Sequence, residues 1–257
     1  MLELRDIRKI YLPGTPDENM IFDSFNLEVP TGQFLSIIGS NGSGKTTLLN
    51  LVCGSLIPEK GQILLDQRDI TYQPEHLRAR RIGRVFQDPA KGTAATLTVL
   101  ENLSIAANKG KPYNLGRGVA KASEAVFAEL LAPLDMGLEN RLHQRCGTLS
   151  GGQRQALALL MSTMTRPDIL ILDEHTAALD PKSSETVMRL TQQLVAARGF
   201  TVLMVTHNLR HALRYGDRLL MMHEGAAILD RSGQAKEDLA LQEVLDLFNN
   251  ISIEAGN

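Results

Sequence analysis

The stretch that decides the fold is Gly39-Ser40-Asn41-Gly42-Ser43-Gly44-Lys45-Thr46-Thr47. It follows the pattern of Gly, four residues of any kind, Gly, Lys and then Ser or Thr, which is typical of a loop that binds phosphate groups. The glycines let successive backbone N–H groups turn inward around a polyphosphate, and the N-terminus of the following helix adds partial positive charge. In such a loop Lys45 reaches the β- and γ-phosphates, and Thr46 offers its hydroxyl to Mg²⁺.

The sequence on both sides of the loop supports this interpretation. The apolar run Phe34–Ile38 predicts a buried strand before it. The run Leu48–Cys53 predicts a helix after it, which ends at Gly54. The alternative is a turn rich in Gly and Ser that binds nothing, and the presence of strand, loop and helix in this order speaks against it. We therefore expect a nucleotide-binding protein.

Length and composition narrow the class of protein. A chain of 257 residues can bury a full α/β core, and its formal charge of −2 lacks the basicity of a dedicated nucleic-acid binder. No run approaches the ~18 apolar residues that cross a bilayer, and the N-terminus lacks the layout of a signal peptide. Cys53 and Cys146 are too far apart for a metal or redox motif, so we expect reduced thiols. We expect a soluble intracellular protein that can reach a membrane through a partner.

Short alternating runs surround the loop region. Leu2–Ile7, Ile21–Val29 and Gly61–Asp66 predict strands of a small antiparallel sheet beside the nucleotide-binding core. After the loop, the densest basic cluster comprises Arg78, Ala79, Arg80, Arg81 and Arg84. We interpret this cluster as a solvated helix face in preference to a binding patch.

The middle of the chain predicts a helical subdomain. Ile82–Phe86 is a short strand that ends at Gln87. Thr98 and Glu101 have the spacing of a helix capping box, and helical sequence continues to about Thr165.

Core strands return after Pro167. Ile169–Leu172 and Thr201–Val205 predict parallel strands separated by the helix Ser183–Arg198. The chain then predicts a hairpin of Leu219–Met222 and Ala226–Leu229. A last amphipathic helix follows, and we expect it to pack on the core through Leu241, Val244, Leu245 and Phe248.

Two carboxylates follow the buried strand at Leu172. Strands that end in acidic residues place them at the carboxyl edge of an α/β sheet, where ligands bind. Asp173 is suited to hold the hydration shell of Mg²⁺, and Glu174 to orient the attacking water or accept its proton. Pairs of acidic residues after strands are common, so Asp173 and Glu174 alone would be weak evidence for a catalytic site. The phosphate loop in the same chain makes this interpretation strong.

A second candidate anion-binding motif is the sequence Leu149-Ser150-Gly151-Gly152-Gln153. Ser150 can cap a helix that begins here, and the two glycines expose N–H groups without side-chain obstruction. A plain helix start with Ser and Gly is the alternative. One chain would then contain two phosphate-binding helix N-termini, which favours the functional interpretation.

Together, the phosphate loop, Gln87, LSGGQ, the strand with Asp173 and Glu174, and His207 resemble the ATPase subunit of ATP-binding-cassette (ABC) transporters. The resemblance covers essentially the whole chain, and LSGGQ is specific to this family among phosphate-loop proteins. It implies an α/β phosphate-loop NTPase core with a parallel sheet, a small antiparallel β subdomain and an inserted helical subdomain. The single domain 1–257 would have its core and β subdomain at about 1–87 and 166–257 and its helical subdomain at about 88–165.

The resemblance also implies roles for individual residues. LSGGQ would contact the γ-phosphate of ATP held by the loop of a second copy, in a head-to-tail homodimer. Gln87 would sense the γ-phosphate and Mg²⁺ and transmit to membrane subunits, and Asp180 would signal across the dimer. His207 would contact the γ-phosphate, although as a bare residue it is a strand-end histidine without a special role. Tyr11 would stack on adenine, although by itself it fits the core equally well.

Two departures from the family pattern stand out. Most members have Pro where this chain has His175, and Pro would restrict Glu174 to an extended backbone. We interpret His175 as a feature of a subgroup and not as a loss of activity. Many members have arginines where this chain has Ala156 and Met161, which puts charge contacts from that helix in doubt.

The function that we expect is ATP hydrolysis that powers a membrane transporter, with ATP and Mg²⁺ as cofactors. Several runs are similar to importer ATPases for amino-acid-type substrates, including tryptophan/tyrosine systems. This function implies permease subunits, an extracytoplasmic substrate-binding protein, and a location at the cytoplasmic face of the inner membrane. The alternatives are a non-transport ABC ATPase that acts on nucleic acid or ribosomes, and a nucleotide-binding regulator without turnover. We expect no nucleic-acid partner, because the chain has no heptad run and no basic face.

Overall fold

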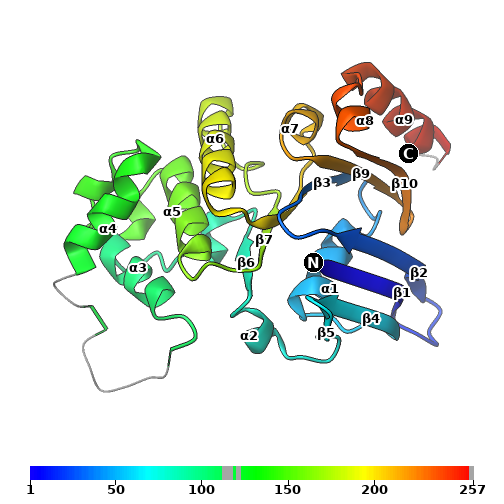
Figure 1. The fold of residues 1–257 in the computed structure, drawn as a ribbon, viewed down its shortest axis with the longest axis horizontal. Coiled ribbons are helices and arrows are strands. Elements are labelled where there is room, and N and C mark those ends of the chain that lie inside the picture. Colours follow the sequence, from blue (N-terminus) through cyan, green and yellow to red (C-terminus); the bar gives the residue numbers. More distant parts are fainter. Residues whose placement is uncertain (112–117, 120–122, 255–257) are drawn as a thin grey trace. The chain divides into compact units, whose positions relative to one another are not determined.

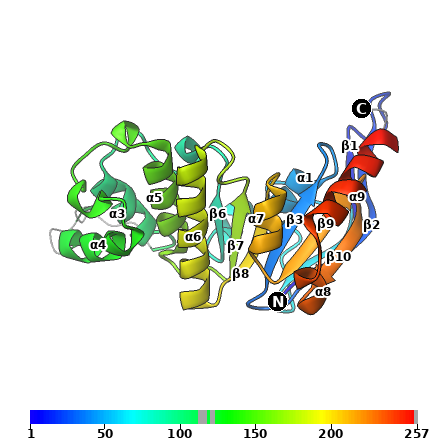
Figure 2. The same cartoon turned by 90° about the horizontal axis from the view of Figure 1, so that it is seen from above.

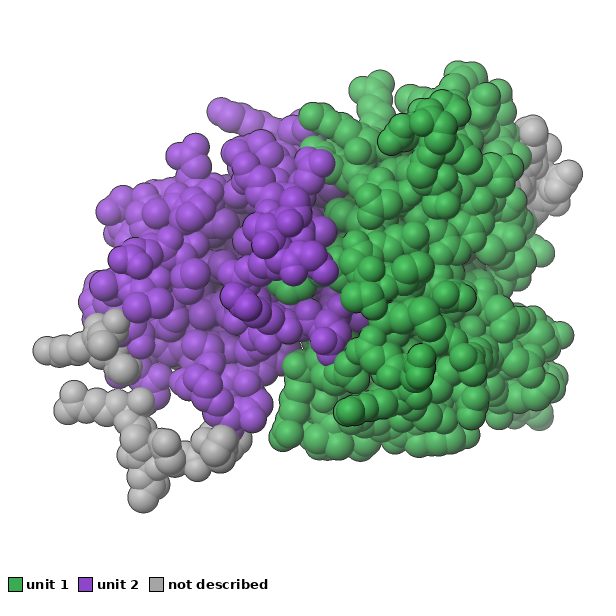
Figure 3. Space-filling view, in the orientation of Figure 1, with its two compact units in different colours: residues 1–82, 200–257 green, residues 83–199 purple. Residues whose placement is uncertain are grey.

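The computed structural model describes residues 1–111, 118–119 and 123–254. The chain forms two compact units, which Figure 3 shows in different colours. Unit 1 comprises residues 1–82 and 200–257, and unit 2 comprises residues 83–199. The subdomain boundaries expected near residues 88 and 165 stay a prediction. Each unit is described by itself below.

A small antiparallel sheet occupies the first part of unit 1 (Figure 1). Its strand order is β2-β1-β4-β5. Leu2, Leu4 and Ile7 of the first strand are buried, and a register shift in the pairing with β2 separates Leu4 from Ile7. The strands are β1 (Leu2–Tyr11), β2 (Asn19–Val29), β4 (Lys60–Leu65) and β5 (Arg68–Asp69). The predicted antiparallel sheet is confirmed.

The second sheet of unit 1 carries the phosphate loop. In the order β10-β9-β3-β8, the central strand β3 pairs in parallel with both β8 and β9, whereas β10 pairs antiparallel with β9. The strands are β3 (Phe34–Gly39), β8 (Thr201–Val205), β9 (Arg218–His223) and β10 (Ala226–Ser232). Every residue of β3 and β8 is buried, as expected of parallel strands covered on both faces. The predicted strand Thr201–Val205 pairs in parallel with β3, and the predicted hairpin is present, so these two predictions are confirmed.

Helices cover this second sheet. Figure 2 shows α7 and α9 over one face, where Ile38, Met221 and Leu229 form a core cluster with Val244. Phe248 packs against the same cluster, so the predicted packing of the last helix is confirmed. The helices of unit 1 are α1 (Lys45–Cys53), α2 (Glu75–Arg78), α7 (Leu209–Arg214), α8 (Gln234–Glu237) and α9 (Leu241–Glu254).

The C-terminal end of α1, the helix after the phosphate loop, is in contact with the buried side chain of Arg78. Gly54 terminates α1 in the left-handed conformation with φ 84°. Arg78 is 2% exposed, and its guanidinium donates to the carbonyl oxygens of four residues: Leu51 (2.7 Å), Val52 (3.0 Å), Thr71 (2.8 Å) and Gln73 (2.9 Å). Burial lowers the pKa of Arg78. The prediction of a solvated face is therefore wrong for Arg78, because the guanidinium satisfies the C-terminal carbonyls of α1.

Unit 2 contains two strands and a group of helices (Figure 1). The strand β7 (Ile169–Asp173) lies next to β6 (Ile82–Val85) in its sheet, and α5 (Gly151–Thr163) packs against α6 (Pro181–Arg198). The capping box at α3 is confirmed, since the Glu101 N–H donates to Thr98 Oγ1 at 3.2 Å and Glu101 Oε2 accepts from the Thr98 N–H at 2.7 Å. The other helices are α3 (Val99–Ala107) and α4 (Ser123–Leu131), with 3₁₀ turns at Pro89–Lys91, Ala132–Leu134, Leu138–Asn140 and Cys146–Thr148.

Replacing Arg78 by Met should destabilise the protein, because buried carbonyl oxygens at the end of α1 lose their donors. We expect the free energy of unfolding to fall by about 3 kcal/mol in urea denaturation. The matched control is Arg80→Met, because Arg80 belongs to the same basic cluster and is exposed. It should change the free energy of unfolding by less than about 0.5 kcal/mol. Equal stability of the two variants would show that the buried guanidinium contributes nothing.

Candidate functional site

The phosphate loop depends on glycine at its first position. Gly39 has φ 154°, and a Cβ atom there would lie 2.2 Å from the carbonyl oxygen of Met222 on β9. Gly44, immediately before α1, has φ 98°, and its Cβ would lie 2.9 Å from the ring of Phe22. A side chain at either position would displace neighbouring atoms, so the loop can take this course only with glycine.

The side chain of Lys45 folds over the loop. Its ammonium donates to the carbonyl oxygens of Gly39 at 2.8 Å and Ser40 at 2.7 Å, and the residue is 6% exposed. Lys45 is also the first residue of α1, whose first-turn N–H groups have no acceptor within the helix. Backbone donors, the helix dipole and a buried ammonium therefore meet at one loop, which is the chemistry that binds a polyphosphate.

Tyr11 and His207 are the other predicted site residues of unit 1. Tyr11 ends β1, and its hydroxyl lies 3.3 Å from Thr47 Oγ1 on α1, so the ring is joined to the helix that follows the loop. His207 follows β8 and is exposed. The Asn208 N–H donates to Thr206 Oγ1 at 3.1 Å across His207, and Asn208 is also the N-cap of α7, where its side chain accepts from the His211 N–H at 3.1 Å.

In unit 2, the predicted metal-binding carboxylate has a cationic partner. Arg84 Nη2 lies 2.7 Å from Asp173 Oδ2, and each side chain is 16% exposed. Arg84 is on β6 and Asp173 is the last residue of β7. The prediction of a solvated face is therefore wrong for Arg84 also. The sequence did contain a signal for this ion pair, because Arg84 lies within the short apolar strand predicted at 82–86. A charge that is buried in such a strand requires a partner of opposite charge.

The predicted base Glu174 begins a tight turn after β7. Its backbone is left-handed with φ 47°, which costs a residue with a side chain about 1–2 kcal/mol. The Glu174 carbonyl oxygen accepts from the Ala177 N–H at 2.9 Å, which closes the turn. Pro at position 175 would favour an extended Glu174, so the left-handed backbone is compatible with the departure from the family pattern.

His175 is directed inward. It is 2% exposed, and its Nε2 lies 3.3 Å from Thr191 Oγ1 on α6. The Thr191 hydroxyl donates to the Val187 carbonyl oxygen at 2.8 Å, so its oxygen accepts from the His175 Nε2–H group. The imidazole therefore anchors the Glu174 turn to α6.

LSGGQ forms the N-terminus of α5, as predicted. Ser150 is its N-cap and accepts from the Gln153 N–H at 3.2 Å, while Gln153 Oε1 accepts from the Ser150 N–H at 3.2 Å. Gly152 lies close to α6, and a Cβ there would be 3.0 Å from Ser183. Ser150 and Gly151 are exposed, so their face of the helix start is open to a ligand.

Asp180 and Gln87 are both exposed. Asp180 caps α6 and accepts from the N–H groups of Lys182 and Ser183 at 3.1 Å each. Hydrogen bonds from the Ser183 side chain and backbone hold the pKa of Asp180 below its usual value, so the helix N-terminus keeps a negative charge.

Gln87 follows Phe86, whose carbonyl oxygen accepts from Gln155 Nε2 at 3.0 Å. Gln155 lies within α5 and is fully buried. The helix that begins with LSGGQ is thereby bonded to the residue before Gln87. Gln155 was not predictable from the sequence, because the contact of its amide with Phe86 depends on how α5 packs against β6.

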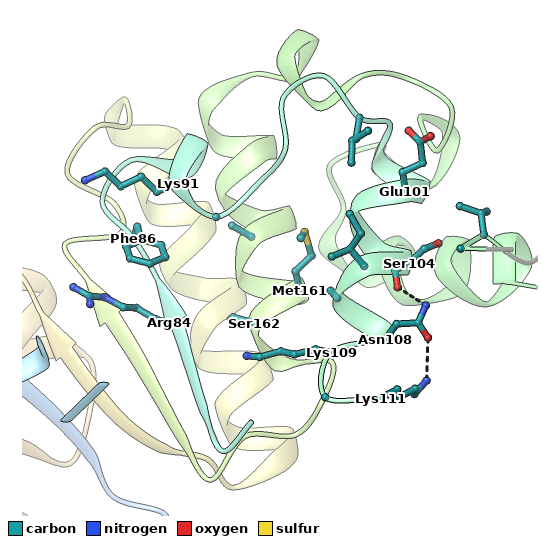
Figure 4. Close-up of a pocket in the computed structure, with 18 residues that line it drawn as sticks. Arg84, Phe86, Lys91, Glu101, Ser104, Asn108, Lys109, Lys111, Met161 and Ser162 are labelled. Carbon is teal, nitrogen blue, oxygen red and sulfur yellow. Dashed lines mark hydrogen bonds between the residues drawn. The ribbon is translucent and has the colours of Figure 1, made fainter. Parts of the chain in front are cut away.

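Unit 2 also holds a pocket of about 1080 Å³ (Figure 4). Figure 4 shows Arg84 and Phe86 on one side, Met161 near the centre and Lys109 below it. Basic side chains outnumber acidic ones in its lining, which includes Arg84, Lys91, Lys109, Lys111 and one carboxylate, Glu101. The pocket can therefore accept a segment that carries apolar and acidic groups.

Cys53 and Cys146 are both buried, and the structure joins neither of them in a disulfide. Burial raises the pKa of the Cys146 thiol to about 11, so it stays protonated and unreactive at neutral pH. Among the residues that the structure describes, no helix is long and apolar enough to cross a membrane. Nor does the described part of the chain contain a group of three or more His, Cys, Asp or Glu that could hold a metal ion.

A parallel strand that leads through a Gly-rich loop into a helix is the defining feature of phosphate-loop NTPases. Comparison with known proteins identifies the family of phosphate-loop NTPases to which the chain belongs. The family described as ABC transporter matches residues 22–177. The chain belongs to this family, as an ATP-binding and ATP-hydrolysing subunit.

Relatives and solved structures match nearly the whole chain. It is 45% identical to the tyrosine transport ATP-binding protein of Clostridioides difficile, over 96% of this chain and 98% of the relative. It is 30% identical to a phosphonates import ATP-binding protein of Treponema denticola, over 100% of this chain and 98% of that relative.

Two solved structures are similar in fold. One is the ADP conformation of an ATP-binding cassette of an ABC transporter, with a TM-score of 0.80 and 28% identity over 98% of each chain. The other is a dimeric cassette in a post-hydrolysis state bound to ADP and Pi, with a TM-score of 0.74 and 29% identity over 90% of this chain and 98% of the other. These findings confirm the predicted family and fold class.

Proposed function

We propose that this chain is the ATPase subunit of an importer for an aromatic amino acid such as tyrosine. The observation that carries the proposal is the 45% identity to the tyrosine transport ATP-binding protein along almost the full length of both chains. The relative at 30% identity is named for phosphonates import, so it supports import but not the same substrate. Both relatives are transport proteins, which favours transport over action on nucleic acid or ribosomes.

Residues of the family motifs would bind ATP. In unit 1, Tyr11 stacks on adenine, and the loop residues with Lys45 surround the phosphates. The buried ammonium already lies on the loop carbonyls, so a phosphate would gain a pre-positioned cation. In unit 2, Gln87 reaches the γ-phosphate. The full ATP-binding set comprises Tyr11, Gly39, Ser40, Asn41, Gly42, Ser43, Gly44, Lys45, Thr46, Thr47, Gln87, Ser150, Gly151, Gly152, Gln153 and Asp180.

The chemistry of the donors fits Mg²⁺. Thr46 offers a hydroxyl, Gln87 an amide oxygen and Asp173 a carboxylate, which are the hard oxygen ligands that this ion prefers. A single carboxylate is sufficient, because Mg²⁺ at nucleotide sites is also held by phosphate oxygens and water. When bound, the ion neutralises charge on the β- and γ-phosphates.

Hydrolysis would proceed by attack of water on the γ-phosphorus. The Glu174 carboxylate orients the water and accepts its proton, while the bond from phosphorus to the β-γ bridging oxygen breaks and releases ADP. Lys45 stabilises negative charge on the β- and γ-phosphates, and His207 contacts the γ-phosphate. The left-handed turn that His175 anchors to α6 limits the positions of the Glu174 carboxylate.

A second copy of the chain would complete each site. Ser150 and Gly151 present an exposed, capped helix start, which is suited to the γ-phosphate of ATP on a partner's loop. The dimeric cassette with ADP and Pi supports such an assembly for a similar fold. Asp180 is exposed at the start of α6 and would contact the partner copy.

Separate permease subunits would contain the transport path and hold the ATPase at the cytoplasmic face of the inner membrane. The pocket next to Phe86 would receive a cytoplasmic segment of the permease. The basic lining of the pocket suits a segment with acidic side chains. Phe86, which lines the pocket, directly precedes Gln87, so docking of this segment would be linked to the ATP site. An extracytoplasmic binding protein would deliver the substrate.

Replacing Glu174 by Gln should lower kcat for ATP hydrolysis by about 10²–10⁴-fold, because the amide cannot accept the proton of water. ATP affinity should not fall, since the neutral variant loses a negative charge that would repel the γ-phosphate. The comparison variant Lys45→Ala should instead weaken ATP binding itself. Phosphate release by the assembled transporter and ATP binding by the chain measure the two effects. Near wild-type turnover of Glu174→Gln would remove Glu174 from the role of base.

An uptake assay tests whether the imported substrate is tyrosine. The chain should be co-purified with its permease and binding protein and reconstituted in proteoliposomes. We expect ATP-dependent uptake of labelled L-tyrosine with the wild-type chain and background uptake with Glu174→Gln. Uptake of a labelled phosphonate measured in parallel provides the control. Phosphonate uptake without tyrosine uptake would contradict the substrate proposal and leave the ATPase proposal intact.

A further inference from the structure

The ion pair between Arg84 and Asp173 involves the carboxylate that the proposed function assigns to Mg²⁺. At 2.7 Å, the guanidinium makes a charge-assisted hydrogen bond to Asp173 Oδ2. Both side chains are largely removed from solvent, with 16% exposure each, so water screens their attraction weakly. The pair is therefore a stronger interaction than an exposed surface ion pair.

A second contact holds the guanidinium in place. Arg84 and Phe86 are two residues apart on the same strand segment, and the centre of the guanidinium lies 4.9 Å from the centre of the Phe86 ring. Figure 4 shows both side chains on the same side of that segment. Stacking on an aromatic ring stabilises a guanidinium and favours one orientation. Arg84 is thus positioned to present its charge to Asp173.

Mg²⁺ and Arg84 would both interact with the Asp173 carboxylate, whose Oδ2 already accepts from the guanidinium. A carboxylate oxygen that accepts a short hydrogen bond from a guanidinium has less capacity to bind a metal ion or its water shell. The two cations would also repel each other strongly at adjacent positions in a partly buried site. Binding of one at Asp173 therefore disfavours the other.

We propose that Arg84 is an internal counter-ion that competes with Mg²⁺ for Asp173, so that Mg²⁺ must displace the guanidinium when it binds with ATP. Arg84 is a positioning residue in this scheme, because it acts on the site only through Asp173. Without a metal ion at Asp173, the guanidinium neutralises the carboxylate. This inference rests on the proposed role of Asp173 in metal binding.

The test measures metal affinity without turnover. Mn²⁺ replaces Mg²⁺ as the probe, and the full chain is loaded with a non-hydrolysable ATP analogue. The Kd for Mn²⁺ in this complex is obtained by electron paramagnetic resonance. Arg84→Met should lower that Kd by about tenfold, because the competing charge-assisted hydrogen bond is lost. Half-saturation of ATP hydrolysis by Mg²⁺ should shift in the same direction.

Two further variants keep the result interpretable. Arg84→Lys preserves the positive charge but loses the planar guanidinium that stacks on Phe86, so its Kd for Mn²⁺ should lie between those of wild type and Arg84→Met. Arg80→Met, which removes an exposed arginine of the same cluster, should leave the Kd unchanged. If Arg84→Met does not fold, Arg84→Gln provides a neutral variant of similar length and should also tighten Mn²⁺ binding.

Asp173→Asn separates failure of this inference from failure of the proposed function. If Asp173→Asn weakens Mn²⁺ binding but Arg84→Met leaves it unchanged, Arg84 does not compete. If Arg84→Met weakens Mn²⁺ binding, Arg84 orients Asp173 for the metal instead, which also overturns the proposal. If Asp173→Asn itself leaves Mn²⁺ binding unchanged, the metal-binding role of Asp173 in the proposed function is wrong, and the inference fails with it.

Discussion

No side chain larger than hydrogen fits at Gly39. A Cβ there would lie 2.2 Å from the Met222 carbonyl oxygen, closer than any two such atoms can approach. This constraint lets the buried strand β3 turn directly into the phosphate loop beside β9. The loop in turn sets the start of α1 at Lys45 and brings the ammonium onto the Gly39 and Ser40 carbonyls. The phosphate-binding geometry therefore depends on a backbone contact within the sheet.

The chain contains two helix N-termini that are built to bind anions, and they belong to different units. The first, α1, follows a glycine loop in unit 1 and contains a buried cation. The second, α5, follows Ser150 in unit 2 and is closed by a capping box. Two such devices in one chain are explained if each contributes to a different nucleotide, and this explanation makes the second copy part of the catalytic site.

Local patterns predicted the elements that depend on local interactions. The strand Phe34–Ile38, the capping box of Thr98 and Glu101, and the cap at Ser150 all follow from residues within a few positions of each other. The interpretation of the basic cluster as a solvated face is wrong for Arg78 and Arg84 because the partners of these two residues are distant in the sequence. Arg78 bonds carbonyls of α1 that lie 27 and 26 residues earlier, and Arg84 pairs with Asp173, 89 residues later.

The site shows the same division between local and long-range contacts. Family motifs predicted Lys45, Asp173 and Glu174 as site residues, whereas the contacts that these residues make in the structure were not predictable. His175 was noticed as a departure from the family pattern, but its bond to Thr191 on α6 required the fold. The left-handed backbone of Glu174 likewise depends on the turn that follows β7.

A mixing experiment tests most directly whether ATP is hydrolysed at sites shared between two copies. Lys45→Ala removes the phosphate loop of one chain, and Ser150→Arg blocks the signature helix of another, so neither homodimer has an intact site. In an equimolar mixture about half of the dimers are heterodimers, each with one intact site of two. Mixing the inactive variants should restore ATP hydrolysis to at most about a quarter of the wild-type rate. If the mixture stays as inactive as its components while mixed dimers form, each chain hydrolyses ATP alone and the account is wrong.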